Sequence, residues 1–180
     1  MCYNFNERMD VMTFNECIDY IKEKHKGQYR KQGTEYYTHP VAVADILREK
    51  GFDEDYQIAG LFHDLLEDTD TTYDELKNIS NEEIAKAVVL VTKEENYNMD
   101  NYMKRIKNND MAHMVKLADR LHNLTEAIYA DSKFREKYIK ETEDHYLDLA
   151  KDTIFQNDID SALNNLKEIR GSYEKCKKII

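Results

Sequence analysis

The sequence predicts an all-α protein with a single domain, and three observations support this class. Only 5 glycines and 1 proline occur among 180 residues, so the chain lacks the turn residues that a many-stranded β protein needs. Apolar residues recur at helical spacing along most of the chain. Capping-box patterns, which open helices, occur at Thr13–Glu16, Thr72–Glu75 and Ser80–Glu83. A hydrophobic content of 41% is sufficient for a core.

The first two predicted helices flank a polar loop. The first covers about residues 13–26, where apolar side chains follow the capping box, and the loop covers 27–38. Pro40 favours the first turn of the second helix, and Gly51 ends it. We therefore expect His39 at the start of a helix.

The middle of the chain contains the most apolar predicted helix. This helix, about 53–67, is apolar around much of its circumference, which predicts a central position. The capping box at Ser80 opens another helix, and a polar loop over 94–101 follows it. A short helix through Tyr102 and Ile106 then precedes a strong one over about 114–124.

Two helices with charged faces, about 132–151 and 158–169, complete the predicted domain, and a short tail covers 171–180. No internal repeat, low-complexity tract or linker interrupts residues 1–180. We therefore expect one domain over the whole chain.

Charge and cysteine content exclude several classes of function. A net charge of -10 argues against a nucleic acid polymer as the main partner, because its phosphates would be repelled. The three cysteines, Cys2, Cys17 and Cys176, are odd in number and lack metal-type spacing, which argues against a disulfide framework or a zinc finger. The polar start of the chain and the lack of a long apolar run predict a soluble cytoplasmic protein without a signal peptide or membrane anchor.

Polar residues interrupt two of the apolar helices. His63 and Asp64 lie in the helix predicted at 53–67, with Glu67 and Asp68 one turn later. Burying such groups is costly unless they are paired, hydrogen-bonded or bound to metal. In the helix at 114–124, Asp119 lies on the polar side and is a candidate metal ligand. Imidazole and carboxylate donors suit manganese, iron, zinc or magnesium, and the choice among these ions stays open.

Three motifs give the chain a family resemblance. Residues 25–33 read His-Lys-Gly-Gln-Tyr-Arg-Lys-Gln-Gly and lead to His39-Pro40, residues 63–69 read His-Asp-Leu-Leu-Glu-Asp-Thr, and residues 116–123 read Lys-Leu-Ala-Asp-Arg-Leu-His-Asn. With these motifs, about residues 24–150 resemble the hydrolase domain of the RelA/SpoT family, which belongs to the HD superfamily. At 180 residues the chain is similar to the small stand-alone alarmone hydrolases of that family.

The resemblance implies a fold, a cofactor and roles for nine residues. It implies a single helical HD domain and a divalent ion of the manganese type. The implied metal ligands are His39, His63, Asp64 and Asp119. The residues implied to orient or activate the attacking water are Glu67 and Asp68. The residues implied to contact a nucleotide are Arg30, Lys31 and Asn123, with Arg30 stacking on the base and Lys31 near the phosphates.

Other interpretations stay open at single positions. A solvated basic loop also explains Arg30 and Lys31, and structural contacts explain Arg120 and His122 equally well. After Asn123 the chain reads Leu124-Thr125-Glu126, where long family members place a basic residue and then threonine, and the negative Glu126 near the pocket puts the exact substrate in doubt.

The leading hypothesis is an enzyme that converts guanosine 3′-diphosphate 5′-di- or triphosphate to GDP or GTP and pyrophosphate. A phosphatase acting on another nucleotide, such as the 2′-phosphate of NADPH, is the alternative within the same class. A non-catalytic nucleotide-binding module is a third hypothesis. It has no chemical need for Glu67 and Asp68 together with four metal ligands. The oligomeric state stays open.

Overall fold

The computed structural model describes residues 11–177, with side chains described for residues 11–169. Within that range every regular element is a helix, and the β-bridge between Tyr29 and Glu35 is isolated. The all-α class predicted from the sequence is therefore confirmed. The polar start of the chain, with Cys2, lies outside the described residues, as does the side chain of Cys176. Among the helices described here, none has the length and apolarity needed to cross a membrane.

The first two helices are α1 (Phe14–Lys24) and α2 (Thr38–Glu49). The capping box predicted at the start of α1 is present, because the Thr13 hydroxyl accepts from the Glu16 amide and the Glu16 carboxylate accepts from the Thr13 amide. Beyond α2, Gly51 has a φ of 85°, which glycine adopts without strain. Both helix starts therefore agree with the sequence prediction, and His39 lies in the first turn of α2.

The single helix predicted over 53–67 is wrong, because it is divided into α3 (Glu54–Phe62) and α4 (Leu65–Asp68). His63 and Asp64 form the break, where Asp64 has φ -100° and ψ -6°. The Gly60 carbonyl, which an unbroken helix would pair with the Asp64 amide, lies 2.8 Å from His63 Nδ1. The break therefore falls on His63 and Asp64, two of the metal ligands that the resemblance implies.

The next elements are α5 (Tyr73–Ile79), α6 (Glu82–Val91), α7 (Met99–Lys107) and α8 (Asp110–Glu126). The capping box predicted at Ser80 is displaced by one residue. The side chain of Asn81 caps α6 and accepts from the Glu83 and Ile84 amides, whereas the Ser80 hydroxyl donates to the Leu76 carbonyl. Asparagine competes for this position because its side-chain oxygen reaches the first-turn amides equally well.

The carboxyl-terminal helices largely follow the prediction. The chain is helical without interruption from α9 (Ser132–Glu141) through the π-helical segment η2 (Thr142–Tyr146) to α10 (Leu147–Ala150), which agrees with the helix expected over 132–151 except for the π-helical turn. The last helix, α11 (Gln156–Lys177), begins two residues before the predicted start and continues into the expected tail. Residues 178–180 lie outside the described part of the chain.

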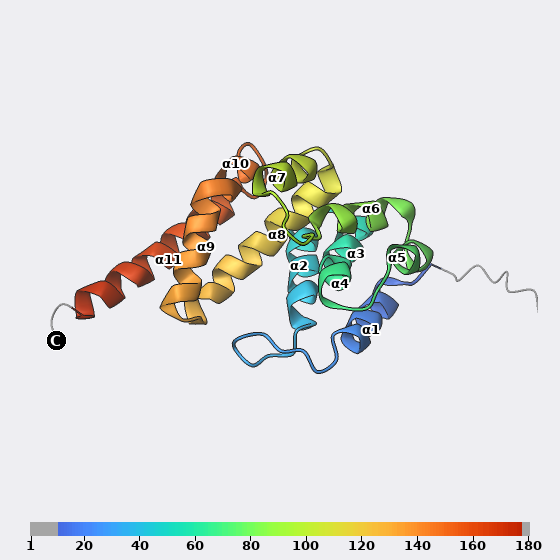
Figure 1. Ribbon diagram of the computed structural model, residues 1–180, viewed down its shortest axis with the longest axis horizontal. Coiled ribbons are helices and arrows are strands. Elements are labelled where there is room, and N and C mark those ends of the chain that lie inside the picture. Colours follow the sequence, from blue (N-terminus) through green and yellow to red (C-terminus); the bar gives the residue numbers. More distant parts are fainter. Residues whose placement is uncertain (1–10, 178–180) are drawn as a thin grey trace, which may run out of the picture.

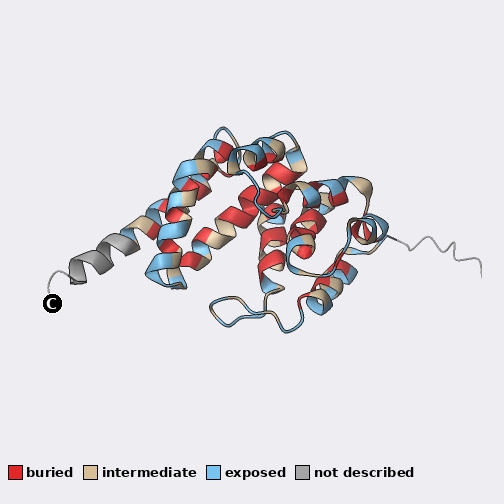
Figure 2. Cartoon of the chain, in the orientation of Figure 1, coloured by how far each residue is buried: buried red, intermediate tan, exposed pale blue. Residues whose placement is uncertain are grey.

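The core forms where α2, α3 and α8 pack together (Figure 1). α3 also contacts α1 and α6, as its apolar circumference predicts, whereas α8 joins this group to α7 and α11. Buried residues follow α2, α3 and α8, and exposed residues lie on the outer faces of the surrounding helices (Figure 2). Gly60 permits the close packing of α3 on α2, because a Cβ atom there would lie 2.8 Å from Leu47 Cδ1. Polar residues on these three central helices are consequently brought together inside the protein.

Candidate metal centre

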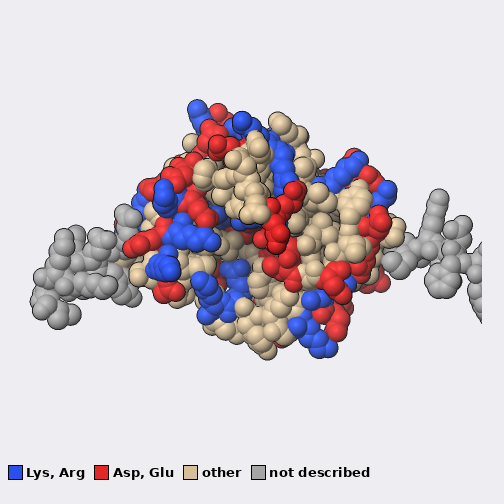
Figure 3. Space-filling view, viewed as in Figure 1, with Lys and Arg blue, Asp and Glu red and all other residues tan. Residues whose placement is uncertain are grey.

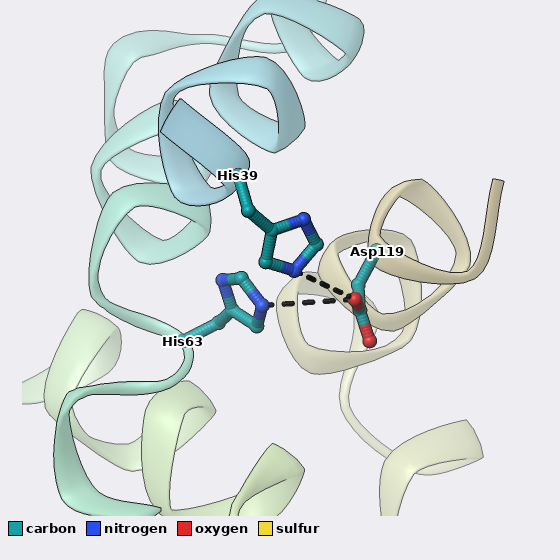
Figure 4. Close-up of side chains that lie close together, drawn as sticks. All are labelled: His39, His63 and Asp119. Atoms are coloured by element: carbon teal, nitrogen blue, oxygen red, sulfur yellow. Dashed lines mark ion pairs between the residues drawn. The ribbon is translucent and has the colours of Figure 1, made fainter. Parts of the chain in front are cut away.

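Three of the predicted metal ligands meet at one buried point (Figure 4). Asp119 Oδ1 lies 3.2 Å from His39 Nε2 and 3.7 Å from His63 Nε2. The donor atoms of all three residues lie within 4.8 Å of one another. His39 comes from the first turn of α2, His63 from the end of α3 and Asp119 from the middle of α8. The packing of the three central helices thus forms the cluster.

Asp64 lies beside this cluster. Its Oδ2 atom is 3.1 Å from His63 Nε2 and 3.6 Å from His39 Nε2. The two imidazoles therefore lie between two carboxylates, Asp119 on α8 and Asp64 at the α3–α4 break. The group of three donors within 4.8 Å of one another does not include Asp64, which approaches the two imidazoles from the α3–α4 break.

Hydrogen bonds orient both imidazoles. His63 Nδ1 lies 2.8 Å from the Gly60 carbonyl, which only accepts, so Nδ1 carries a proton. His63 Nε2 is buried and has no hydrogen-bond partner among the described residues. His39 Nδ1 lies 2.8 Å from His122 Nδ1, and burial with the nearby His39 lowers the pKa of His122 to about 3. Neutral His122 can accept from His39 Nδ1, which leaves His39 Nε2 directed at the cluster.

The charges of the cluster favour a bound cation. Burial opposes a charge on His63, but the carboxylates of Asp64 and Asp119 outweigh it and raise the pKa of His63 to about 10. Two buried carboxylates therefore draw positive charge into the site, either a proton on imidazole or a metal ion. Because imidazole nitrogens and carboxylate oxygens gather at one buried point, the residues fit a divalent metal ion.

Asp119 is held by two further residues on α8. Lys116 Nζ lies 2.8 Å from Asp119 Oδ2, and Asn123 Nδ2 donates to Asp119 Oδ1. Burial alone would raise the pKa of Asp119, but Lys116 and the imidazoles offset it and hold that pKa well below its usual range. Asp119 is thus ionised, with Oδ2 turned to lysine and Oδ1 turned to the imidazoles.

The predicted catalytic carboxylates take different directions. Asp68 Oδ2 accepts from the Tyr36 hydroxyl at 2.8 Å, and the same hydroxyl lies 2.8 Å from Asp64 Oδ2. Burial and the nearby Asp64 raise the pKa of Asp68. Glu67 Oε2 instead accepts from the backbone amide of Lys93, on the α6–α7 connection, at 3.0 Å. Asp68 is therefore linked to Asp64 through the Tyr36 hydroxyl, whereas Glu67 is held by the α6–α7 connection, and both residues are exposed.

A pocket of about 190 Å³ is lined by all three predicted nucleotide-contacting residues, Arg30, Lys31 and Asn123. Arg30 Nη2 donates to Asn123 Oδ1 at 3.0 Å, so Asn123 connects the pocket to Asp119. Phe134 and Tyr138 on α9 also line the pocket, and Lys31 Nζ lies 4.2 Å from the centre of the Phe134 ring. On the face of the molecule that Figure 3 draws, acidic side chains lie near the middle with basic side chains beside them.

From the sequence, one residue of the site, Tyr36, was missed, and the roles of two others, His122 and Arg120, were left undecided. The only sequence signal of Tyr36 is that it is an aromatic residue three positions before His39. His122 contacts the metal centre indirectly, because its Nδ1 atom lies 2.8 Å from His39 Nδ1. Arg120 has a structural role, because it pairs with Glu141 at 3.1 Å and its guanidinium lies 3.6 Å from the centre of the Tyr146 ring. His113 is a packing residue, with Nε2 lying 2.7 Å from a backbone carbonyl of α10.

Comparisons with known proteins identify the family of the chain. The HD domain family matches residues 17–153. The guanosine-3′,5′-bis(diphosphate) 3′-pyrophosphohydrolase of Aquifex aeolicus is 42% identical over 141 residues, which cover 73% of this chain and 20% of that protein. The protein named guanosine-3′,5′-bis(diphosphate) 3′-pyrophosphohydrolase MESH1 from Danio rerio is 36% identical over 118 residues, 61% of this chain and 66% of the relative. The chain thus spans about a fifth of the length of several curated relatives that it matches.

Solved structures support the same fold. A metazoan orthologue of SpoT that hydrolyses ppGpp superposes with a TM-score of 0.73 at 24% identity, covering 84% of this chain and 94% of that one. A Listeria monocytogenes protein superposes with a TM-score of 0.59 at 23% identity, and the match covers 74% of this chain and 98% of the Listeria chain. At these identities the superpositions establish the architecture alone.

Proposed function

Because the chain belongs to the HD domain family, we propose that it is a metal-dependent phosphohydrolase acting on guanosine 3′-diphosphate 5′-di- or triphosphate. The products are pyrophosphate, released from the 3′ position, and GDP or GTP. The relatives from Aquifex aeolicus and Danio rerio are both named for this reaction, which supports the choice of substrate.

One observation carries the proposal. The buried donors of His39, His63 and Asp119 lie next to a pocket that contains a guanidinium, an ammonium and aromatic rings. Asn123 contacts both places, since it donates to Asp119 and accepts from Arg30. A nucleotide bound in the pocket would therefore place a phosphate within reach of the metal centre.

The residues proposed to hold the ion are His39, His63, Asp64 and Asp119. Their mixed imidazole and carboxylate donors suit several divalent ions, and we propose Mn²⁺ among them because the resemblance to the RelA/SpoT hydrolase domain implies an ion of the manganese type. When bound, such an ion lowers the pKa of a water molecule and stabilises negative charge on a phosphoryl oxygen. His122 fixes the His39 ring, and the Gly60 carbonyl fixes the His63 ring, so both Nε2 atoms keep their orientation during turnover.

The proton of the attacking water is proposed to pass to a carboxylate next to the centre. Glu67 presents its Oε1 atom for this role while Oε2 stays bonded to the Lys93 amide. Asp68 orients the water from the other side, with its own position fixed by the Tyr36 hydroxyl. Both side chains belong to exposed residues, so the proton can afterwards leave to solvent.

Recognition of the nucleotide is proposed for Arg30, Lys31 and Asn123. Arg30 offers a planar cation that can stack on guanine, and Lys31 offers a point charge for the phosphates. With a net charge of -10, the chain needs this local positive charge to hold an anionic substrate. We also propose a cytoplasmic location, because the buried Cys17 thiol is unpaired, which suits a reducing compartment.

The experiment that tests the proposal is a panel of nucleotides incubated with the Mn²⁺-loaded protein, with pyrophosphate and orthophosphate measured separately. We expect pyrophosphate from guanosine 3′-diphosphate 5′-diphosphate and no orthophosphate from NADPH. Orthophosphate from NADPH without pyrophosphate from the guanosine nucleotide would replace the proposal with a 2′-phosphatase. Nucleotide binding without either product would show a non-catalytic module.

A further inference from the structure

The hydroxyl of Tyr36 lies between two carboxylates. It is 2.8 Å from Asp64 Oδ2 and 2.8 Å from Asp68 Oδ2. Asp64 Oδ2 is also the oxygen that faces the His39 and His63 rings. A single tyrosine oxygen therefore connects a proposed metal ligand with a proposed water-orienting carboxylate.

The loop between α1 and α2 holds Tyr36 in this place. Its backbone amide donates to the Gln28 carbonyl at 3.0 Å, and its ring lies 4.8 Å from the buried His25 ring. The Gln28 side chain donates to the Asp68 carbonyl at 2.8 Å and lies 2.8 Å from His25 Nδ1. The loop is thus attached to Asp68 twice, once through Tyr36 and once through Gln28.

Two carboxylates at such a short distance from one oxygen repel each other unless a donor lies between them. A tyrosine hydroxyl has one proton, which it donates to one of the two carboxylates at a time, and its oxygen fixes the separation of the two groups. Its ring packs against two imidazoles, because the ring centre of Tyr36 lies 4.8 Å from that of His25 and 6.1 Å from that of His39, with the His39 ring nearly perpendicular to it.

We propose that Tyr36 is a positioning residue, which holds Asp64 for the metal ion and Asp68 for the attacking water. This inference rests on the proposed function. It has two parts, because the Asp64 contact acts on metal binding and the Asp68 contact acts on turnover. Hydrogen-bonding partners of metal ligands, when removed, reduce metal affinity or activity by roughly 10- to 100-fold.

The test compares Tyr36→Phe with Tyr37→Phe. The first change removes the hydroxyl and keeps the ring on His25. The second is a matched control, because Tyr37 is the next residue, its ring lies 5.6 Å from Lys22 Nζ, and it lines a different cavity. Mn²⁺ affinity is measured from the electron paramagnetic resonance signal of the free ion, without nucleotide, and kcat, KM and Tm are measured alongside.

For Tyr36→Phe we expect a loss of roughly 10- to 100-fold in kcat, a weaker affinity for Mn²⁺ and a KM within about threefold of the wild-type value. Tyr37→Phe should match the wild type in all of these. Unchanged kcat and Mn²⁺ affinity in Tyr36→Phe would overturn the inference. A higher KM with normal kcat would overturn it as well, because Tyr36 would then act on the substrate.

A double-mutant cycle with Asp68→Asn separates positioning from a general loss of structure. If Tyr36 acts on turnover through Asp68, Tyr36→Phe should change kcat little in the Asp68→Asn protein. If the losses in kcat of Tyr36→Phe and Asp68→Asn are fully additive in the double mutant, Tyr36 does not act on turnover through Asp68. Failure of the proposed function is recognised separately, because a wild-type protein that hydrolyses no nucleotide would still show whether Tyr36→Phe weakens Mn²⁺ binding.

Discussion

Replacing Lys116 by methionine tests the electrostatics of the centre. Lys116 Nζ lies 2.8 Å from Asp119 Oδ2, and both side chains are about 9% exposed. Burial lowers the pKa of Lys116, but Asp119 more than offsets it, so the ammonium stays charged. Methionine keeps most of the side-chain volume and removes the charge, which leaves Asp119 buried without its cation.

The magnitude follows from the burial of this ion pair. Removing one partner of a buried pair costs about 3–5 kcal/mol, because the other charge stays uncompensated. For a chain of this size each kcal/mol lowers Tm by about 2–4 °C, so the metal-free Lys116→Met protein should melt about 6–20 °C below the wild type. A bound divalent ion would supply the missing positive charge to Asp119. The loss should therefore become much smaller when the ion is present.

Thermal melts in chelator and in excess Mn²⁺ measure the loss in Tm of Lys116→Met without and with the ion. Arg120→Leu is a suitable control, because it also removes a buried cation of α8 from an ion pair, here with Glu141 of α9 at 3.1 Å. Its loss in Tm should be similar with and without the ion. If Lys116→Met loses equal stability in both conditions, the charge of Lys116 is not coupled to the metal centre and the reasoning is refuted.

Three further predictions concern turnover, recognition and the fold. Glu67→Gln should keep Mn²⁺ and lose most of kcat, whereas Asp119→Ala should lose both, as metal content and rate measured together will show. Arg30→Ala should raise KM several-fold to tens-fold and change kcat less, because a cation stacked on a purine contributes about 0.5–2 kcal/mol, and steady-state kinetics will separate the two constants. Thr13→Ala removes the cap of α1, which should cost about 0.5–2 kcal/mol in a thermal or urea melt and leave kcat unchanged.

Different results would contradict each prediction. A normal rate in Glu67→Gln would move proton transfer to another group, most directly Asp68. A collapse of kcat with normal KM in Arg30→Ala would show that the guanidinium contacts the phosphoryl group only in the transition state. Reduced kcat in Thr13→Ala would show that the start of α1 is coupled to the centre.

Much of the fold and of the centre could be predicted from local sequence signals. Capping residues and apolar spacing depend on neighbours within a few positions, so the start of α1 and the all-α class were accessible. The motifs around His39, His63 and Asp119 selected residues that the structure brings together. The polar residues that interrupt the apolar helices, His63, Asp64 and Asp119, indicated a site because buried polar groups require partners.

The remaining contacts join residues far apart in the sequence. Tyr36 lies in a polar loop, and nothing near it shows that its hydroxyl meets Asp64 and Asp68. The contact of His122 with His39 likewise depends on how α8 crosses α2. The break between α3 and α4 was missed because the apolar spacing continues across it. The sequence does not show that the His63 Nδ1 atom, and not a backbone amide, bonds to the Gly60 carbonyl.

The placement of the three buried donors has a consequence for the topology of the chain. His63 ends α3 and Asp119 lies within α8, so an ion held by both would close a loop that contains α4, α5, α6 and α7. Such a cross-link restricts the unfolded chain in the way a disulfide does, without needing an oxidising compartment. The lifetime of the folded protein, and its resistance to proteolysis, would then follow the supply of the metal as well as its own sequence.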